Sequence, residues 1–198
     1  DAEFKREKIL TVTYTVAATK DMSERFASRF GQDLADRLEF RTINGICARV
    51  IQYYGRKTAR TAFSLLTDEK RISAILSAIY QKTERVYPTQ GDLKNVRTLI
   101  TYIKNRMLNE KEIEALDETA EIQISEIYKE YCKHLRENQL MDYDDQMVYA
   151  YNMLRKIPWL LEYFQDQYPY ICVDEAQDTS KIQHAIIALL ATESGNLF

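Results

Sequence analysis

The stretch Tyr168–Val173 is a run of apolar and aromatic residues that ends directly in a cluster of carboxyl and amide side chains. A segment that is apolar on both faces predicts a strand inside a parallel sheet, because helices cover both faces of such a sheet. The polar residues that follow are costly to desolvate and repel one another, so stability alone does not explain them. They are Asp174, Glu175, Gln177 and Asp178. The pattern predicts a ligand site at the carboxyl end of this strand.

Two further segments near the start of the chain have the pattern of a strand followed by a helix. Lys8–Tyr14 is rich in β-branched and aromatic residues, and apolar residues recur every four positions in Ala17–Phe30. A weaker extended segment, Leu38–Thr42, leads into a second helical pattern over Ile43–Tyr54. These patterns predict two more strands, each followed directly by a helix.

The middle of the chain has helical periodicity almost throughout. It covers residues 58–167, with breaks near Pro88 and Asn138. Asp142 is suited to cap the helix that follows it, and Pro158 is suited to the first position of the next helix. We therefore expect a large helical block between the second and third strands.

The order of elements favours an α/β fold with an inserted helical subdomain over an all-α bundle. Residues 1–53 and 141–198 are expected to form the part that carries the sheet, and a last helix is expected at Lys181–Ala191. Residues 54–140 are expected to form the helical insert.

Composition excludes several classes of protein. No apolar run approaches the roughly 18 residues that cross a bilayer, and the charged start lacks the apolar centre of a signal peptide, so we expect a cytoplasmic protein without a membrane partner. Three cysteines and two histidines at wide spacings do not form a disulfide framework or a zinc motif. The net charge of −3 argues against a uniformly basic nucleic-acid binder. Only residues 1–60, with 12 Lys and Arg against 8 Asp and Glu, offer phosphates a favourable field.

The carboxylates after the last strand are suited to phosphoryl chemistry with a metal ion. Mg²⁺ prefers oxygen ligands and keeps several waters, so Asp174 is suited to hold it together with a phosphate. Glu175, one residue further on, is suited to orient and deprotonate a water for in-line attack on phosphorus. The simpler interpretation is that Asp174 and Glu175 form an ordinary acidic turn ahead of a helix.

Pro169–Ser180, PYICVDEAQDTS, resembles motif II of the UvrD/Rep family of superfamily-one helicases, the Walker B element whose usual form ends in DEYQDTN. Asp142–Tyr168 is similar to the family's lead-in to this motif. Ile9–Phe26 resembles motif Ia and Phe40–Ile51 resembles motif Ib, so three motifs stand in the family's order. The resemblance implies a partial RecA-like parallel sheet with a helical insert. It also implies the first motor domain of an ATP-dependent helicase that moves 3′ to 5′ on single strands and unwinds duplex DNA.

The resemblance implies roles for individual residues. Asp174 would hold Mg²⁺ and contact the nucleotide, and Glu175 would activate water. Gln177 would contact the γ-phosphate or link it to the DNA site. The residues that would face DNA are Thr13, Tyr14, Thr15, Thr42 and Asn44. The tyrosine would stack on bases, although an ordinary strand position is also open for it, and the asparagine is equally suited to a cap or a turn.

No glycine-rich loop ending in Gly-Lys-Ser/Thr occurs among the five glycines. The family has that loop upstream of motif Ia, so we expect an internal fragment, inactive by itself, whose parent supplies the remaining ATP- and Mg²⁺-binding parts. A sheet without its flanking strands would leave an uncovered edge, which predicts self-association. One alternative is a degenerate, ATP-independent helicase-like module that binds DNA or protein. A metal nuclease is a third possibility, but Thr-Ser-Lys follows Asp178 where such sites commonly add a Glu-x-Lys.

Overall fold

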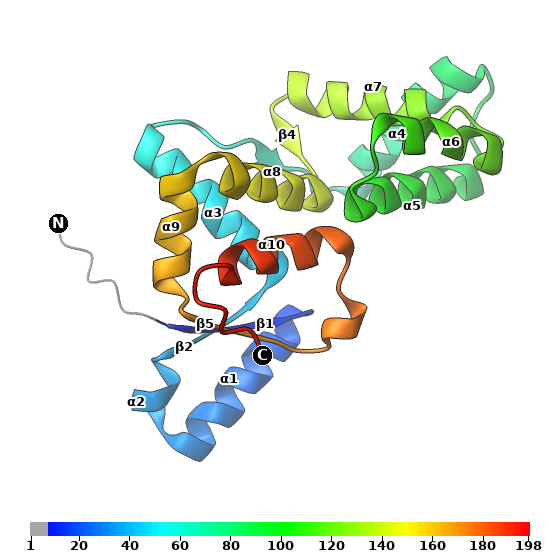
Figure 1. Cartoon of the computed structure of the whole chain (residues 1–198). Coiled ribbons are helices and arrows are strands. Elements are labelled where there is room, and N and C mark those ends of the chain that lie inside the picture. The colour runs from blue at the N-terminus through cyan, green and yellow to red at the C-terminus, as the bar shows by residue number, and fades with distance from the viewer. Residues whose placement is uncertain (1–7) are drawn as a thin grey trace. The chain divides into compact units, whose positions relative to one another are not determined.

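The computed structural model describes residues 8–198 and divides the chain into two compact units (Figure 1). The sheet unit comprises Asp1–Thr61 and Gln146–Phe198, and the helical unit comprises Ala62–Asp145. Residues 1–7, which the sequence assigns to the part that carries the sheet, lie outside the described residues. The predicted α/β class with a large helical insertion is confirmed. No helix among residues 8–198 has both the length and the apolar character needed to cross a membrane.

The sheet consists of three parallel strands in the order β2–β1–β5. β1 covers Ile9–Thr13, β2 covers Leu38–Thr42 and β5 covers Tyr170–Val173. In this register, Leu10 of β1 is paired with Glu39 on one side and Ile171 on the other. The three strands predicted from the sequence therefore form a single sheet, with β1 between the other two.

The last residues of the chain run alongside β5. The backbone N–H of Val173 donates to the Phe198 carbonyl at 2.8 Å, and the N–H of Phe198 donates to the Ile171 carbonyl at 2.9 Å. Ile171 and Leu197 form a parallel bridge. The sheet edge beside β5, which we expected to be uncovered, is therefore occupied by Asn196–Phe198.

A hydroxyl cap follows each strand of the sheet. Thr15 accepts a hydrogen bond from the N–H of Ala18 at 3.0 Å, and Thr42 accepts one from the N–H of Gly45 at 3.1 Å. Ser180 caps the helix after β5 in the same way. Such caps satisfy N–H groups that lack a partner in the first turn, so each helix begins at or near the carboxyl end of its strand. These helices are α1 (Val16–Phe30), α3 (Ile43–Thr58) and α10 (Lys181–Ala191).

The main core of the sheet unit lies on one face of the sheet. Figure 1 shows α3, α9 (Pro158–Gln167) and α10 on that face, and α1 with the short α2 (Gln32–Ala35) on the other. The side chains that fill the core are almost completely buried, and each contributes about 1.5–3 kcal/mol. They include Leu10, Ile46, Val50, Leu160, Phe164, Ile171 and Ile186. Helix α8 (Tyr143–Lys156) begins in the helical unit and continues into the sheet unit.

Glu39 is a buried carboxylate on β2 that two arginines satisfy. It accepts hydrogen bonds from Arg41 and from Arg49, and Arg49 also donates to the Tyr168 hydroxyl at 2.7 Å. Burial opposes ionisation of Glu39, but the hydrogen bonds and charges of the two arginines outweigh it and lower its pKa below the ordinary 4.5. The ionised carboxylate therefore stabilises the sheet unit.

This carboxylate gives a prediction about acid stability. A group whose pKa falls on folding stabilises the protein above its unfolded-state pKa and loses that contribution as the pH drops through the folded-state pKa. We expect Glu39→Gln to lower the free energy of unfolding by about 1.5–3 kcal/mol near neutral pH. The difference should shrink between about pH 5 and about pH 3, measured by urea unfolding. The exposed Glu118 gives the control, Glu118→Gln. A difference for Glu39→Gln that is independent of pH would contradict the assignment.

The helical unit contains four helices and a two-stranded parallel ladder. The helices are α4 (Glu69–Glu84), α5 (Gln90–Arg106), α6 (Glu110–Ala120) and α7 (Ile124–Glu137). The ladder pairs β3 (Ser64–Leu65) with β4 (Leu140–Met141). One apolar cluster forms the core, which includes Ile72, Leu76, Val96, Ile100, Ile103, Ile124, Ile127 and Leu135. The unit therefore has a core of its own.

Candidate functional site

The acidic cluster begins where β5 ends, next to the end of β1. The backbone N–H of Asp174 donates to the carbonyl of Val12 at 3.0 Å, which extends the pairing of β5 with β1 by one hydrogen bond. Asp174 is half-buried, whereas Glu175 is exposed. The fold thus fixes the backbone of the first carboxylate and leaves the side chain of the second accessible to solvent.

Glu175 has a left-handed backbone conformation, with φ 50° and ψ 44°. Most other non-glycine residues with positive φ in the described part of the chain cap the carboxyl ends of helices, whereas Glu175 stands between a strand and a single 3₁₀ turn, Ala176–Asp178. Such a conformation costs about 1–3 kcal/mol and persists only where the surrounding structure holds it. The Gln177 amide donates a hydrogen bond to the Glu175 carboxylate. Strain at a carboxylate of this kind is typical of functional sites.

The first turn of α10 holds the acidic turn in place. The Thr179 hydroxyl donates to the Ala176 carbonyl at 2.7 Å, and His184 contacts the same hydroxyl through Nε2. Because the hydroxyl proton is used at Ala176, the Thr179 oxygen accepts the hydrogen bond from His184. No role was predicted for this histidine from the sequence. The contact could not be read from residue spacing, because it depends on how α10 starts.

The end of β1 contributes Thr13, Tyr14 and Thr15. Thr13 is buried, and its hydroxyl donates to the Thr15 carbonyl at 3.3 Å, while Thr15 caps α1. Tyr14 lies between them and is 43% exposed. Partial burial raises the pKa of Tyr14, and the negative charges of Asp178 and Glu175 raise it further. The structure therefore brings Tyr14, a candidate for DNA stacking, close to the carboxylates of the acidic turn.

The end of β2 contributes Thr42 and Asn44, and both are half-buried. Thr42 uses its oxygen to cap α3. Asn44 lies in the first turn of α3, and its Oδ1 atom is shielded from solvent without a hydrogen bond from any described residue. Buried amide oxygens normally have a donor, so a missing partner at this atom is uncommon.

The side chains present fit an ion shared with a phosphate better than an ion held by protein alone. Within residues 8–198, no group of three or more His, Cys, Asp or Glu side chains is arranged as a metal site. A half-buried carboxylate, Asp174, beside an exposed one, Glu175, supplies the hard oxygen ligands that Mg²⁺ prefers when phosphate completes its shell. The donor set is thus compatible with Mg²⁺ bound together with a nucleotide.

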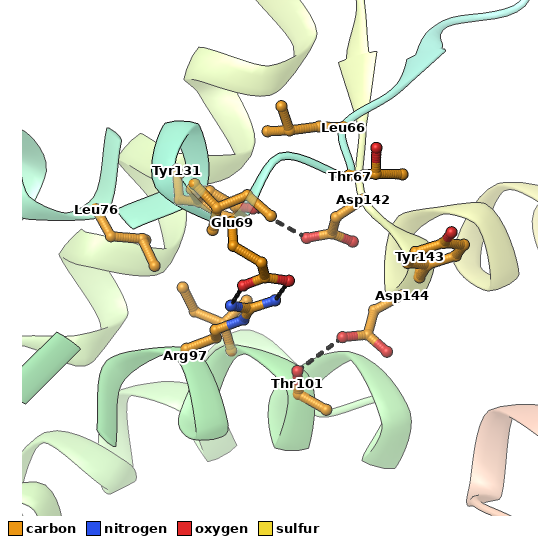
Figure 2. Close-up of a pocket in the computed structure, with 12 residues that line it drawn as sticks. Leu66, Thr67, Glu69, Leu76, Arg97, Thr101, Tyr131, Asp142, Tyr143 and Asp144 are labelled. Carbon is orange, nitrogen blue, oxygen red and sulfur yellow. Dashed lines mark hydrogen bonds and ion pairs between the residues drawn. The ribbon is translucent and has the colours of Figure 1, made fainter. Parts of the chain in front are cut away.

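A separate polar pocket lies inside the helical unit (Figure 2). Figure 2 shows the ion pair of Glu69 and Arg97 in its lining, where Arg97 donates to Glu69 at 2.7 Å, and Thr101 donates to Asp144 at 2.8 Å. Its volume of about 80 Å³ is far below the roughly 300–1,000 Å³ of pockets for small-molecule ligands. The pocket is therefore too small for a nucleotide.

Lys104 forms a buried ion cluster in the same unit. Its ammonium group lies 2.7 Å from an oxygen of Asp142 and 2.7 Å from an oxygen of Asp145, and the residue is 3% exposed. Burial works to lower the pKa of Lys104, but the two carboxylates outweigh it and raise that pKa. Asp142 also accepts the N–H of Asp145 at 2.7 Å and so caps α8, as the sequence predicted. The lysine and both carboxylates are used within the fold.

Comparison with known proteins identifies the family. The family model described as UvrD/REP helicase N-terminal domain matches residues 1–198. The ATP-dependent DNA helicase PcrA of Bacillus subtilis (strain 168) is 29% identical over 191 residues, which are 96% of this chain and 25% of that protein. PcrA of Leuconostoc citreum is 27% identical over 191 residues, with the same coverage, and PcrA of Staphylococcus aureus (strain Mu50) is 27% identical over 192 residues. The chain spans about a quarter of the length of these relatives. The resemblance found in the sequence is thus confirmed, and the chain belongs to the UvrD/Rep helicase N-terminal domain family.

Proposed function

We propose that this chain is part of the first motor domain of an ATP-dependent helicase that moves 3′ to 5′ on single-stranded DNA and unwinds duplex DNA. One observation carries the proposal: β1 and β5 pair in parallel, with Val12 opposite Val173, so Tyr14 and the acidic turn follow the carboxyl ends of adjacent strands. The candidate nucleotide chemistry and the candidate DNA contact thus share one end of one sheet. The names of the relatives, ATP-dependent DNA helicases, support the same assignment.

The chain's own residues have distinct roles in this proposal. Asp174, fixed through its backbone to Val12, would hold Mg²⁺, and Gln177 would contact the nucleotide and orient Glu175. Glu175 would accept the proton of the attacking water. When bound, ATP would supply the γ-phosphate and Mg²⁺ would neutralise part of its charge. The chain has no Gly-Lys-Ser/Thr sequence, so we expect it to hydrolyse no ATP unless the rest of the parent protein is present.

Tyr14 is the most testable of the proposed DNA contacts, because Thr13 is buried and the side chains of Thr15 and Thr42 already cap α1 and α3. Stacking of a base on an aromatic ring contributes about 1–3 kcal/mol. We expect Tyr14→Ala in the full-length protein to weaken binding of single-stranded DNA by about 5- to 150-fold, measured by fluorescence anisotropy at low salt. Tyr14→Phe keeps the ring and should retain most of the affinity. Equal affinity for wild type and Tyr14→Ala would remove Tyr14 from the DNA site.

A strand-displacement assay tests the motor and its direction. Duplexes with a 3′ or a 5′ single-stranded tail would be incubated with the full-length protein and ATP. We expect displacement of the strand from the 3′-tailed duplex only, and none without ATP. Displacement from the 5′-tailed duplex alone would reverse the direction. Tight binding without displacement or ATP hydrolysis would favour the ATP-independent module.

Two further expectations from the sequence remain predictions. Among the described strands, β2 has a neighbour on one side only, so its edge is the place where self-association is expected. A monomeric mass by light scattering at high concentration would count against it. The cytoplasmic location also stays a prediction, for which fractionation of cells that express the full-length protein is the test.

A further inference from the structure

Aromatic and basic side chains gather where α3 ends and α9 begins. The rings of Tyr54 and Trp159 stack with centroids 6.1 Å apart and planes inclined by 17°. Arg60 Nη1 lies 3.5 Å from the Tyr54 hydroxyl, and Lys57 Nζ lies 5.5 Å from the centre of the Tyr53 ring. We call Tyr54, Lys57, Arg60 and Trp159 the α3–α9 surface. All four residues belong to the sheet unit.

The charge around this surface is one-sided. Residues 43–61 contain four basic residues and no acidic residue. Arg49 is bound to Glu39, but Arg56, Lys57 and Arg60 are exposed, and no ion pair is found for them among the described residues. Arg155 and Lys156, just before α9, are also exposed. The acidic residue of α9 that is nearest to Trp159 in sequence is Glu162. The local field therefore favours an anion.

Trp159 packs against two tyrosine rings and stays partly open to solvent. The inner rings form the packed layer: Tyr53 and Tyr163 stack at 3.9 Å, and Phe164 is completely buried. Trp159 contacts the Tyr53 ring, with centroids 6.3 Å apart, and is 42% exposed. A large aromatic ring that is held by neighbours yet open to solvent is a common element of binding surfaces. Unpaired cations beside it contribute little to stability.

An exposed ring combined with unpaired cations fits single-stranded nucleic acid. Cations attract phosphates and rings stack on bases without regard to sequence. An acidic peptide would use the cations but leave the indole ring without a matching partner. We propose that the α3–α9 surface is a second contact for single-stranded nucleic acid, separate from the candidate site at the strand ends. α3 begins at the Thr42 cap and runs for 16 residues, so its far end lies about 24 Å from that cap.

Trp159 provides the test, because it is the single tryptophan of the chain. Stacking of a base on it should quench its fluorescence, so a titration of this chain with oligothymidylate at low salt reports on this surface directly. We expect Lys57→Glu/Arg60→Glu to weaken the quenching titration at least tenfold. Two lost phosphate contacts should also reduce the slope of log affinity against log salt by about 1.4.

The matched control is Lys94→Glu/Lys111→Glu, which changes the net charge equally at exposed positions of the helical unit. It should leave the midpoint within twofold of wild type, and circular dichroism should show the same fold in every variant. Three results would overturn the proposal: no quenching for wild type, equal weakening by the control, or equal quenching by polyglutamate, which would assign the surface to acidic peptides.

Discussion

The full-length protein carrying Glu175→Gln should bind ATP normally and hydrolyse it about 10²- to 10⁴-fold more slowly than wild type. Glutamine has nearly the same shape as glutamate and suits the same exposed turn, but its amide cannot accept a proton from water. Asp174 keeps its carboxylate and its backbone hydrogen bond to Val12 in this variant. Steady-state phosphate release measures turnover, and titration with a fluorescent ATP analogue measures binding.

The control for this variant is Glu193→Gln, at an exposed position just after α10. Like Glu175→Gln, it removes one negative charge near an end of α10, and it should leave turnover unchanged. Near-normal hydrolysis by Glu175→Gln would contradict the role of Glu175 as the base. A combined loss of ATP binding and turnover would instead show that Glu175 supports the nucleotide site structurally.

The largest expected effect on stability comes from Lys104→Ala. Removal of the ammonium group leaves the buried carboxylate of Asp145 and the partly buried one of Asp142 without their cation, and breaking a buried pair in this way costs about 3–5 kcal/mol. The control is Lys82→Ala, because Lys82 pairs with Glu130 at 2.8 Å while 72% of its side chain is exposed. Exposed pairs contribute about 0–1 kcal/mol. Urea unfolding gives both values, and equal losses would contradict the account of the cluster.

The pH dependence of the Lys104→Ala variant separates lost charge from lost packing. Burial already raises the pKa of Asp145, and loss of the lysine should raise it further. A carboxyl whose pKa is higher in the folded state favours folding as the pH falls, because the folded state then binds the proton more tightly. The deficit of the variant relative to wild type should therefore shrink from about pH 7 to about pH 4. A constant deficit would indicate lost packing alone.

Local patterns in the sequence were sufficient to predict the strands, the helical insert and several helix ends. The run before Asp174 is a strand because its apolar residues suit a sheet covered on both faces. The cap at Asp142 follows from its position before a helix, and its hydrogen bond to the N–H of Asp145 confirms it. Such features depend on a few neighbouring residues, which is why the sequence alone reveals them.

Features that depend on distant partners were not predictable in the same way. Lys104 is one of two lysines on its helix, and its burial follows from carboxylates 38 and 41 positions away. The proximity of Tyr14 to Asp178 depends on the register between β1 and β5. The left-handed conformation of Glu175 and the contact of His184 with Thr179 likewise depend on how the strand meets α10. The sequence located the candidate site, and the structure added its anchoring contacts.

The most direct test of the account is the rate of ATP hydrolysis by the full-length protein with and without single-stranded DNA. The proposal places the nucleotide chemistry of Glu175 and the DNA contact of Tyr14 at one end of the sheet, so DNA binding should accelerate hydrolysis. We expect slow hydrolysis without DNA and clear stimulation by an oligothymidylate strand. A full-length protein that binds the strand yet hydrolyses no ATP in its presence would contradict the motor assignment.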